Sequence, residues 1–233
     1  MKKSIYFAVI TLVLLFVSAC QTDNNPPKVI YPVYLPMSVG NYWIYQHYKI
    51  DSLGNETATN LFDSLVITKD TFINGNRYYV FGGVQAAAIT FPDILRDSLG
   101  YIVTQKGEKI FSSINLTDTI NSFHYFIDIS DDNHEDSIEI YSIKLIMQKP
   151  PQQQIVPAGT FTTLMAHGIV KCYWFFYDNT WNRSATVSID KNEYFAQNVG
   201  IIVDTYRWYY QIQKEKIKYE KRLIRYHVAE TGL

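Results

Sequence analysis

Short runs of β-branched and aromatic residues, each ended by Gly, Asn, Asp or Ser, follow one another from about residue 37 to the end of this chain. The first run, Tyr42–Ile50, is dense in aromatic residues, and the turn after it has Gly54-Asn55 at its apex. About a dozen such runs recur at spacings of roughly 8–15 residues, and no long amphipathic helical segment separates them. Because strands joined by short turns pair antiparallel, the pattern predicts an all-β, or mainly β, domain.

Turn residues also indicate which strands form hairpins. The expected pairs are Tyr101–Gln105 with Lys109–Ser113, Phe123–Ile129 with Ile138–Met147, and Thr160–Val170 with Cys172–Tyr177. Gly107 lies in the first of these turns, and an acidic loop forms the second. We interpret the Pro-rich segment 150–154 as a surface connection, because proline lacks the N–H that a strand ladder needs.

Two predicted strands are apolar on both faces, which constrains the architecture further. Tyr173–Tyr177 reads Tyr-Trp-Phe-Phe-Tyr, and Ile201–Val203 is similar. A strand exposed on one face should alternate apolar and polar residues, so both faces of these strands must be covered. A single large curved antiparallel sheet, or open half-barrel, around an aromatic-lined interior meets this need. A two-sheet β-sandwich with a solid core is the alternative, and the sequence leaves it open.

The first twenty residues are the most specific functional signal in the chain. Lys2 and Lys3 precede the apolar run Ile5–Phe16, and Val17-Ser-Ala-Cys20 leads into polar residues. This is the anatomy of an export signal, and the apolar run is shorter than the roughly 20 residues that span a bilayer. Cys20 in this context resembles the lipobox cysteine of bacterial lipoproteins. The resemblance implies cleavage before Cys20, a diacylglycerol thioether on its sulfur and a third acyl chain on its amine.

These signals divide the chain into three parts. We expect residues 1–19 to be a signal peptide, residues 20–36 to be the lipidated cysteine with a flexible Pro-containing tether, and residues 37–233 to be the antiparallel β domain. Three acyl chains exceed what stable anchoring needs, so the partner that the sequence predicts is a membrane. The resemblance implies a Gram-negative cell envelope, with the protein anchored by lipid in the outer membrane and facing either the periplasm or the cell surface.

The charge balance argues against a nucleic-acid partner. The formal net charge is −1, and removal of Lys2 and Lys3 with the leader makes it −3. Phosphate binding requires a stripe of Lys and Arg, and no such stripe dominates this sequence. The oligomeric state is left open.

Three short stretches occur together in an order that is typical of one protein family. They are Val39-Gly-Asn-Tyr-Trp43, Val156-Pro-Ala-Gly-Thr-Phe161 and Glu193-Tyr-Phe-Ala-Gln-Asn-Val-Gly-Ile201. Over about residues 37–210 the chain resembles a large group of uncharacterised secreted bacterial lipoproteins with these signatures (VGNYW, PAGTF and YFAxxVGI). The resemblance implies a curved antiparallel sheet similar to the half-barrels of periplasmic lipoprotein carriers of the LolA and LolB type, and it implies no established activity. The motifs consist largely of Gly, Pro and aromatic residues, so we interpret them as fold points.

Residues able to support catalysis are scattered along the chain. The sequence contains no Gly-x-Ser-x-Gly, His-Glu-x-x-His or P-loop motif, and its five histidines form no close pair with metal-ligand spacing. Cys172 stands apart from any His or Asp motif, and with Cys20 used for lipid no other cysteine remains to form a disulfide with it. We interpret Cys172 as a small buried hydrophobic residue, and we expect no enzymatic activity and no cofactor.

The acidic loop over residues 128–139 has the spacing of an EF-hand-like calcium loop. Its candidate ligands are Asp128, Asp132, Asp136 and Glu139. The sixth position is Asn133 instead of Gly, and the flanking segments are predicted strands instead of helices. An ordinary solvated hairpin loop is the favoured interpretation, and a weak Ca²⁺ site is the alternative.

A tripeptide of Asp, a hydroxyl residue and a branched aliphatic residue recurs along the chain. Its hydroxyl residues are Ser52, Ser64, Ser98, Thr119 and Ser137. The form resembles the acceptor motif of an O-glycosylation system in some exported bacterial proteins, and the resemblance implies a glycan on these residues. Ordinary turn chemistry is the alternative, because Asp and Ser cap turns and the aliphatic residue starts the next strand.

The surplus of aromatic residues bears on what the domain does. We take Trp43, Trp174, Phe176 and Trp208 as candidates for lining the interior, where they would bind an apolar ligand by desolvation. The favoured function is non-catalytic: binding an apolar ligand or acyl chain in the half-barrel, or supporting envelope assembly. A surface-exposed module that binds a glycan or a protein through exposed aromatic residues is the alternative.

Overall fold

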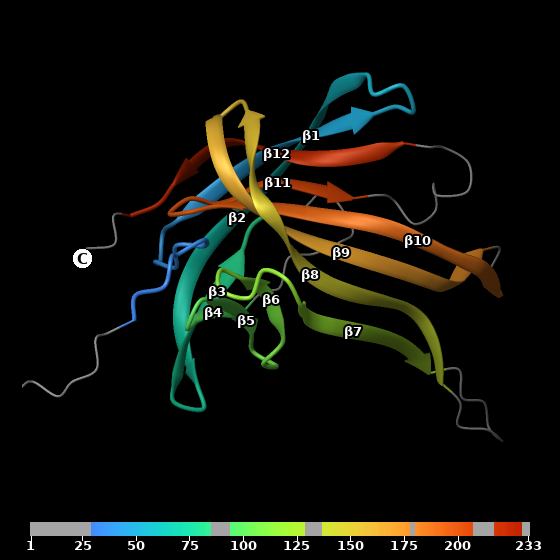
Figure 1. Cartoon of the computed structure of the whole chain (residues 1–233), viewed down its shortest axis with the longest axis horizontal. Coiled ribbons are helices and arrows are strands. Elements are labelled where there is room, and N and C mark those ends of the chain that lie inside the picture. The colour runs from blue at the N-terminus through green and yellow to red at the C-terminus, as the bar shows by residue number, and fades with distance from the viewer. Residues whose placement is uncertain (1–28, 85–93, 129–136, 178–179, 207–216, 230–233) are drawn as a thin grey trace, which may run out of the picture. The chain divides into compact units, whose positions relative to one another are not determined.

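The computed structural model describes residues 29–84, 94–128, 137–177, 180–206 and 217–229, which form twelve β-strands (Figure 1). The strands are β1 (Tyr42–Ile50), β2 (Glu56–Ile73), β3 (Asn76–Gly82), β4 (Ile94–Ser98), β5 (Tyr101–Thr104), β6 (Lys109–Ser112), β7 (Thr119–Asp128), β8 (Ser137–Val156), β9 (Gly159–Tyr177), β10 (Thr180–Ala196), β11 (Gly200–Tyr206) and β12 (Lys218–His227). None of the described residues forms a helix of the length and apolar character needed to cross a membrane.

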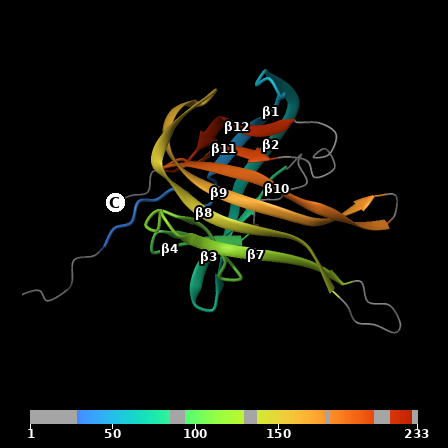
Figure 2. The ribbon, with the colours of Figure 1, turned by 45° about the vertical axis from the view of Figure 1, so that its right-hand side comes forward.

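All twelve strands belong to one antiparallel sheet. Their order across it is β6-β5-β4-β3-β2-β1-β12-β11-β10-β9-β8-β7, so the first strand hydrogen-bonds to the last. The edge strands β6 and β7 are consecutive in the sequence but lie at the two ends of the strand order. The sheet curves strongly along its width from one edge strand to the other (Figures 1 and 2). The result is a sheet that nearly closes into a barrel with a single seam between β6 and β7. The expected single curved sheet is confirmed, and the described strands do not form the alternative two-sheet sandwich.

Two of the three expected hairpins are present. β5 pairs with β6 around Gly107, and β7 pairs with β8 around the acidic loop. The third expectation is wrong, because Gly159–Tyr177 is one continuous strand that pairs with β8 on one side and with β10 on the other. Only Lys171 separates the two expected strands, and a single residue of this kind cannot reverse the chain.

The Pro-rich segment 150–154 is also part of a strand, and its interpretation as a surface connection is wrong. β8 runs through it, and the pairing of β8 with β9 shifts register between Gln148 and Gln152. An irregularity of this kind accommodates residues that cannot donate to the ladder, so the strand continues past the prolines. β8, β9 and β10 are 20, 19 and 17 residues long, and they extend beyond β11 at one end of the sheet (Figure 1).

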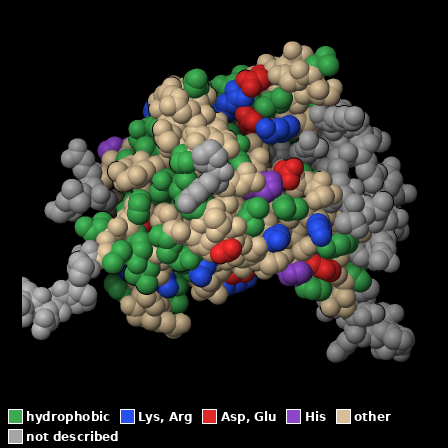
Figure 3. All heavy atoms as spheres, in the orientation of Figure 1, with side chains coloured by type: hydrophobic (Ala, Val, Ile, Leu, Met, Phe, Trp, Pro, Cys, Tyr) green, Lys and Arg blue, Asp and Glu red, His purple; other side chains and the backbone are tan. Residues whose placement is uncertain are grey.

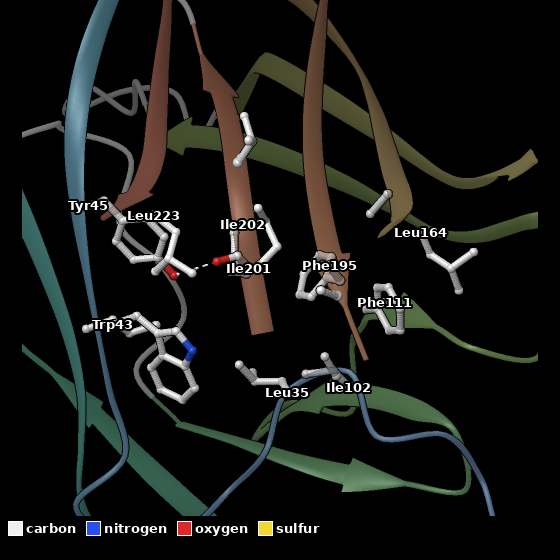
Figure 4. Close-up of a cluster of buried hydrophobic side chains, with 14 of the residues drawn as sticks. Leu35, Trp43, Tyr45, Ile102, Phe111, Leu164, Phe195, Ile201, Ile202 and Leu223 are labelled. Carbon is white, nitrogen blue, oxygen red and sulfur yellow. Dashed lines mark hydrogen bonds between the residues drawn. The ribbon is translucent and has the colours of Figure 1, made fainter. Parts of the chain in front are cut away.

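An apolar core fills the inside of the sheet at the end opposite to this extension. Trp43, Phe111, Phe195, Ile202 and Leu223 are almost completely buried there, and each comes from a different strand (Figure 4). Inward positions of strands far apart in the sequence therefore meet in one cluster. This end of the interior is a packed core of side chains.

The segment before β1 also packs on the core. Leu35 is buried among the core side chains (Figure 4), and the Asn198 N–H donates to the Val33 carbonyl at 2.8 Å. The compact unit of the chain begins at Tyr31. Residues 31–36, which the sequence places in the tether, therefore belong to the same compact unit as the sheet.

Candidate functional site

Charged side chains replace apolar ones on the inner face of the sheet just beyond the core. Along β1 the inward positions are Trp43, Tyr45 and His47, and all three are buried. From His47, ionisable side chains continue across the neighbouring strands β2, β1, β12, β11 and β10. We call these side chains the interior charged row; they are Asp63, His47, Lys221, Asp204, Glu193 and Lys191.

The strand register explains why these residues share one layer. His47 lies opposite Lys221, Lys221 lies opposite Asp204, and Asp204 lies opposite Glu193. Directly opposed residues of an antiparallel pair point to the same face, so one inward position places all four side chains inside. Lys191 precedes Glu193 by two residues and shares its face, because side chains alternate along a strand.

Short ion pairs join the side chains at the buried end of the row, which lies on β1 and β2. His47 Nε2 lies 2.8 Å from Asp63 Oδ1. Lys221 Nζ lies 3.0 Å from Asp204 Oδ2 and 3.6 Å from Asp63 Oδ2, so one ammonium group is shared by two carboxylates. The His47 and Asp63 side chains are 0% and 4% exposed, which seals this end of the row from solvent.

The other end of the row is more open. Lys191 Nζ lies 2.8 Å from Glu193 Oε1, and these side chains are 24% and 14% exposed. Gly168 of β9 lies opposite Lys191 of β10. A Cβ at Gly168 would lie 3.5 Å from the Lys191 carbonyl oxygen and 3.7 Å from the Lys191 Cβ. Lys191 and Glu193 are therefore the most exposed members of the interior charged row.

Burial and the carboxylates act in opposite directions on the two lysines. Desolvation lowers the pKa of Lys221, but the Asp204 and Asp63 carboxylates raise it more, so the pKa lies above its ordinary value. Desolvation likewise opposes the charge of Lys191, and Glu193 and Asp204 hold its pKa well above the ordinary value. Both ammonium groups therefore remain charged inside the sheet at neutral pH.

Tyr45 marks the boundary between the core and the row. Burial raises the pKa of Tyr45 well above its ordinary value, and the Asp204, Glu193 and Asp63 carboxylates raise it further. The hydroxyl therefore stays protonated, and it donates to the Ile201 carbonyl at 3.2 Å. Tyr45 thus satisfies a backbone acceptor while its ring packs on the apolar side.

The sequence does not single out the interior charged row. Its members are distributed from β1 to β12, and each one resembles an ordinary polar residue of a strand. The available signal is the alternation along β1, where His47 follows Trp43 and Tyr45 at the inward positions. A titratable residue in an apolar period-two series indicates a polar interior, but its partners are decided by the register.

Beyond the row, the inner face of β7–β10 is apolar and only partly covered. Tyr125 stacks on Tyr141 with ring centroids 4.3 Å apart, although Tyr125 is 46% exposed. Several other side chains of this face are half-buried. We call this surface the distal apolar face; its residues are Phe123, Tyr125, Tyr141, Ile143, Val170 and Cys172.

The register places the distal apolar face on the same side of the sheet as Lys191. Val170 follows Gly168 by two residues on β9 and lies opposite Ile143, which lies opposite Phe123. Lys144, Lys171 and Asp190 alternate with these positions and are exposed on the outer face. Lys and Arg are interspersed with Asp and Glu on the surface shown in Figure 3, and no large area of one sign is visible in that view.

Cys172 is buried within the distal apolar face, as the sequence predicts. Burial raises the pKa of its thiol to about 11, so very little of the nucleophilic thiolate exists at neutral pH. We expect iodoacetamide at about pH 7.5 to modify Cys172 at least about tenfold more slowly in the folded protein than in guanidinium chloride. Intact mass followed over time measures both rates, and equal rates would contradict a buried thiol.

The aromatic candidates for lining the interior fall in different places. Trp43 is part of the packed core, where its Nε1–H donates to the Val199 carbonyl at 2.6 Å. Trp174 and Phe176 belong to β9, but their side chains lie outside the described residues, as does Trp208 altogether. For these three aromatic residues, lining of an interior stays a prediction.

The acidic-loop candidates lie largely outside the described residues. Asp132 and Asp136 are not described, and of Asp128 only the backbone at the end of β7 is. Glu139 Oε1 lies 2.6 Å from His124 Nδ1. No group of His, Cys, Asp and Glu within the described ranges could hold a metal ion, and the Ca²⁺ site stays a prediction. Lipidation also stays a prediction, because Cys20 is outside these ranges.

The repeated tripeptides occupy turns and strands. Asp51 Oδ1 accepts hydrogen bonds from the Leu53 and Asn55 N–H groups at 2.8 and 2.9 Å, so the first tripeptide carries out turn chemistry. Ser64 Oγ accepts from the Val84 N–H at 2.9 Å. The exposed hydroxyl residues are Ser52, Thr119 and Ser137, and the half-buried ones are Ser64 and Ser98. Modification of these residues stays a prediction.

The three signature stretches contribute to the same core. Gly200 illustrates why one of their residues must be glycine: its φ is +121°, and a Cβ there would lie 2.7 Å from Trp43 Nε1. The Ala158 N–H, from the second stretch, donates to the Leu223 carbonyl at 3.1 Å. The structure therefore brings the stretches together as packing elements at the closed end of the sheet.

Comparisons with known proteins add the following. No protein-family model matches the chain, and no curated protein matches its sequence. Similar solved structures include a protein from Bacteroides fragilis assigned as exported, with a YmcC-like fold, at 13% identity over 84% of this chain and 99% of that chain, with a TM-score of 0.41. A protein from Parabacteroides distasonis assigned as a lipoprotein shares 11% identity over 85% of this chain and 100% of that chain, with a TM-score of 0.41. Similarity at this level assigns no function to the chain.

Proposed function

We propose that this protein is a lipid-anchored component of the cell envelope that binds an apolar ligand, such as an acyl chain, without catalysing a reaction. Export and anchoring rest on the leader and on Cys20 in its lipobox-like context. The observation that carries the ligand proposal is the distal apolar face, an inward apolar surface whose side chains are mostly half-buried and which continues from a packed core.

Desolvation supplies the affinity in this proposal. Burial of apolar surface is favourable by roughly 25 cal/mol per Å², and half-buried side chains such as Ile143 and Val170 still have surface to bury. An acyl chain laid along the strands would cover them. Its polar end would lie at Lys191 and Glu193, the solvent-reaching end of the interior charged row.

The chemistry of the site favours binding over catalysis. The ionisable groups of the row are engaged with one another, as in the 3.0 Å pair of Lys221 and Asp204. The raised pKa of Lys221 keeps its amine protonated, and the pKa of about 11 keeps the Cys172 thiol protonated. A nucleophile needs the opposite conditions, namely a lowered pKa or an adjacent base.

Two adjacent residues of β9 provide a matched test. Val170 and Ile169 are both half-buried, and they lie on opposite faces of the sheet. We expect Val170→Asn to weaken binding of a fluorescent fatty acid, cis-parinaric acid, by about tenfold, because a polar amide replaces apolar contact surface. Ile169→Asn should leave the dissociation constant nearly unchanged. Fluorescence titration of the purified full chain measures both values, and circular dichroism checks that each variant is folded.

Two results would contradict the proposal. One is equal weakening by the two substitutions, which would place the probe elsewhere or report general destabilisation. The other is an unmodified protein that binds no acyl probe and carries no lipid in native mass spectra after extraction from its own membrane. A lipid retained through that extraction and lost in Val170→Asn would support it.

A further inference from the structure

The two edges of the sheet differ in length and in chemistry. β6 has four residues, and the ammonium group of its Lys109 lies 4.2 Å from the centroid of the Tyr101 ring. β7 has ten residues, and positions 119–127 contain no Lys, Arg, Asp or Glu. Edge strands of soluble proteins are usually short, charged or covered, because an open edge pairs with other strands. β6 is short and charged, whereas β7 is longer and has one such charged residue, Asp128, at its end.

β7 is paired along one side only within the described part of the chain. It forms a ladder with β8, and no described strand pairs with its other edge (Figure 2). Across the seam, Asn121 Nδ2 donates to the Lys109 carbonyl at 3.2 Å. After Asn121, β7 carries large side chains that are exposed to solvent. His124, Tyr125 and Phe126 are 52%, 46% and 58% exposed.

We propose that β7 is a dimerisation edge, at which β7 of one copy pairs antiparallel with β7 of a second copy and extends the sheet across both molecules. This is an isologous contact, so the same strand serves both partners and assembly stops at two. Pairing of β7 with β6 of another copy would instead build an open-ended polymer. The four residues and the lysine of β6 oppose that outcome.

The charge pattern favours a second copy over a strand from another protein. Two like charges directly opposite each other destabilise a strand pair. When positions 119–127 of two copies pair, no two charged side chains face each other, except that His124 faces the His124 of the other copy in one register. A foreign strand would find no Lys, Arg, Asp or Glu at positions 119–127 to select it. A second copy supplies the same uncharged aromatic strand, so each buries the exposed Tyr125 and Phe126 of the other.

Native mass spectrometry of the full chain tests the proposal. We expect a dimer for the unmodified protein, and we expect Phe126→Lys to raise the dimer dissociation constant by at least about tenfold, since lysine on an edge strand opposes pairing. Phe72→Lys is the matched control, because Phe72 is 70% exposed but lies on β2, which is not an edge strand of the sheet, and opposite Arg77 of β3. This control should remain a dimer. Hydrogen exchange should show protected β7 amides in the unmodified protein and faster exchange of them in Phe126→Lys.

Three outcomes would overturn the proposal. The unmodified chain could be monomeric at about 100 µM, a concentration well above the dissociation constants of about 1 µM or less that are typical of specific complexes. The dimer could persist unchanged in Phe126→Lys, which would place the interface elsewhere. Alternatively, the mass of the complex could correspond to one copy with a different polypeptide, which would make β7 a docking edge for another protein. None of these outcomes bears on the acyl-chain proposal, which is tested at Val170.

Discussion

Replacement of Trp43 by alanine is expected to lower the free energy of unfolding by about 3–5 kcal/mol, because it leaves a large cavity in a packed core. Trp43 is 0% exposed, and its Nε1–H donates to the Val199 carbonyl at 2.6 Å. Gly200 packs so closely on the indole that a Cβ there would lie 2.7 Å from Nε1. Guanidinium unfolding followed by far-ultraviolet circular dichroism measures the loss without depending on tryptophan fluorescence.

Two further variants separate the contributions at this position. Trp43→Phe keeps an aromatic ring but removes the N–H donor, so the half-buried Val199 carbonyl loses its bond, and we expect an intermediate loss of about 1–3 kcal/mol. Phe72→Ala, at a side chain that is 70% exposed, should change stability by less than about 1 kcal/mol. A smaller loss for Trp43→Ala than for Phe72→Ala would show that Trp43 is not a core residue.

Lys221→Met is expected to destabilise the protein by about 3–5 kcal/mol, because removal of one partner from a buried ion pair leaves uncompensated charge. The Lys221 side chain is 12% exposed and its ammonium group lies between Asp204 and Asp63. Methionine has a similar length, so the lost charge dominates over lost packing. Chemical denaturation at neutral pH measures the change.

Lys218→Met is the matched control on the same strand. Lys218 is 39% exposed on the outer face and forms a 2.7 Å ion pair with Glu220. Lys218 is more exposed than Lys221, and Glu220 keeps its 2.7 Å ion pair with Arg222 when Lys218 is replaced, so this loss should stay below about 1 kcal/mol. Equal losses for Lys221→Met and Lys218→Met would contradict the special role of the interior charged row.

The raised pKa of Lys221 also determines how this contribution depends on pH. Because the folded pKa lies above the unfolded value of about 10.4, the stabilisation is fully present below about pH 10 and is lost as the pH rises through the folded pKa. Lys191 and Tyr45 have raised pKa values and act in the same direction. The unmodified protein should therefore lose stability steeply in alkali. Lys221→Met should show a shallower slope, and an unchanged slope would argue against a folded-state ion pair at Lys221.

Local signals determined the strands of this protein and much of its topology. The aromatic run Tyr42–Ile50 and the turn at Gly107 are visible in the sequence because period-two alternation and glycine act over a few residues. The same signals failed at Lys171 and around the prolines of β8. Whether a strand continues there depends on neighbours on both sides and on a register shift, and neither is a local property.

The sequence by itself also determined an interior, since strands such as Ile201–Val203 are apolar on both faces and must be covered. Only the tertiary structure decided what that interior contains. His47 lies opposite Lys221 because the first strand pairs with the last, and a slip of β12 by one residue in that register would turn Lys221 outward while His47 stayed inside. The charged row, the distal apolar face and the open edge at β7 are all consequences of pairing between distant strands, which no stretch of a few residues encodes.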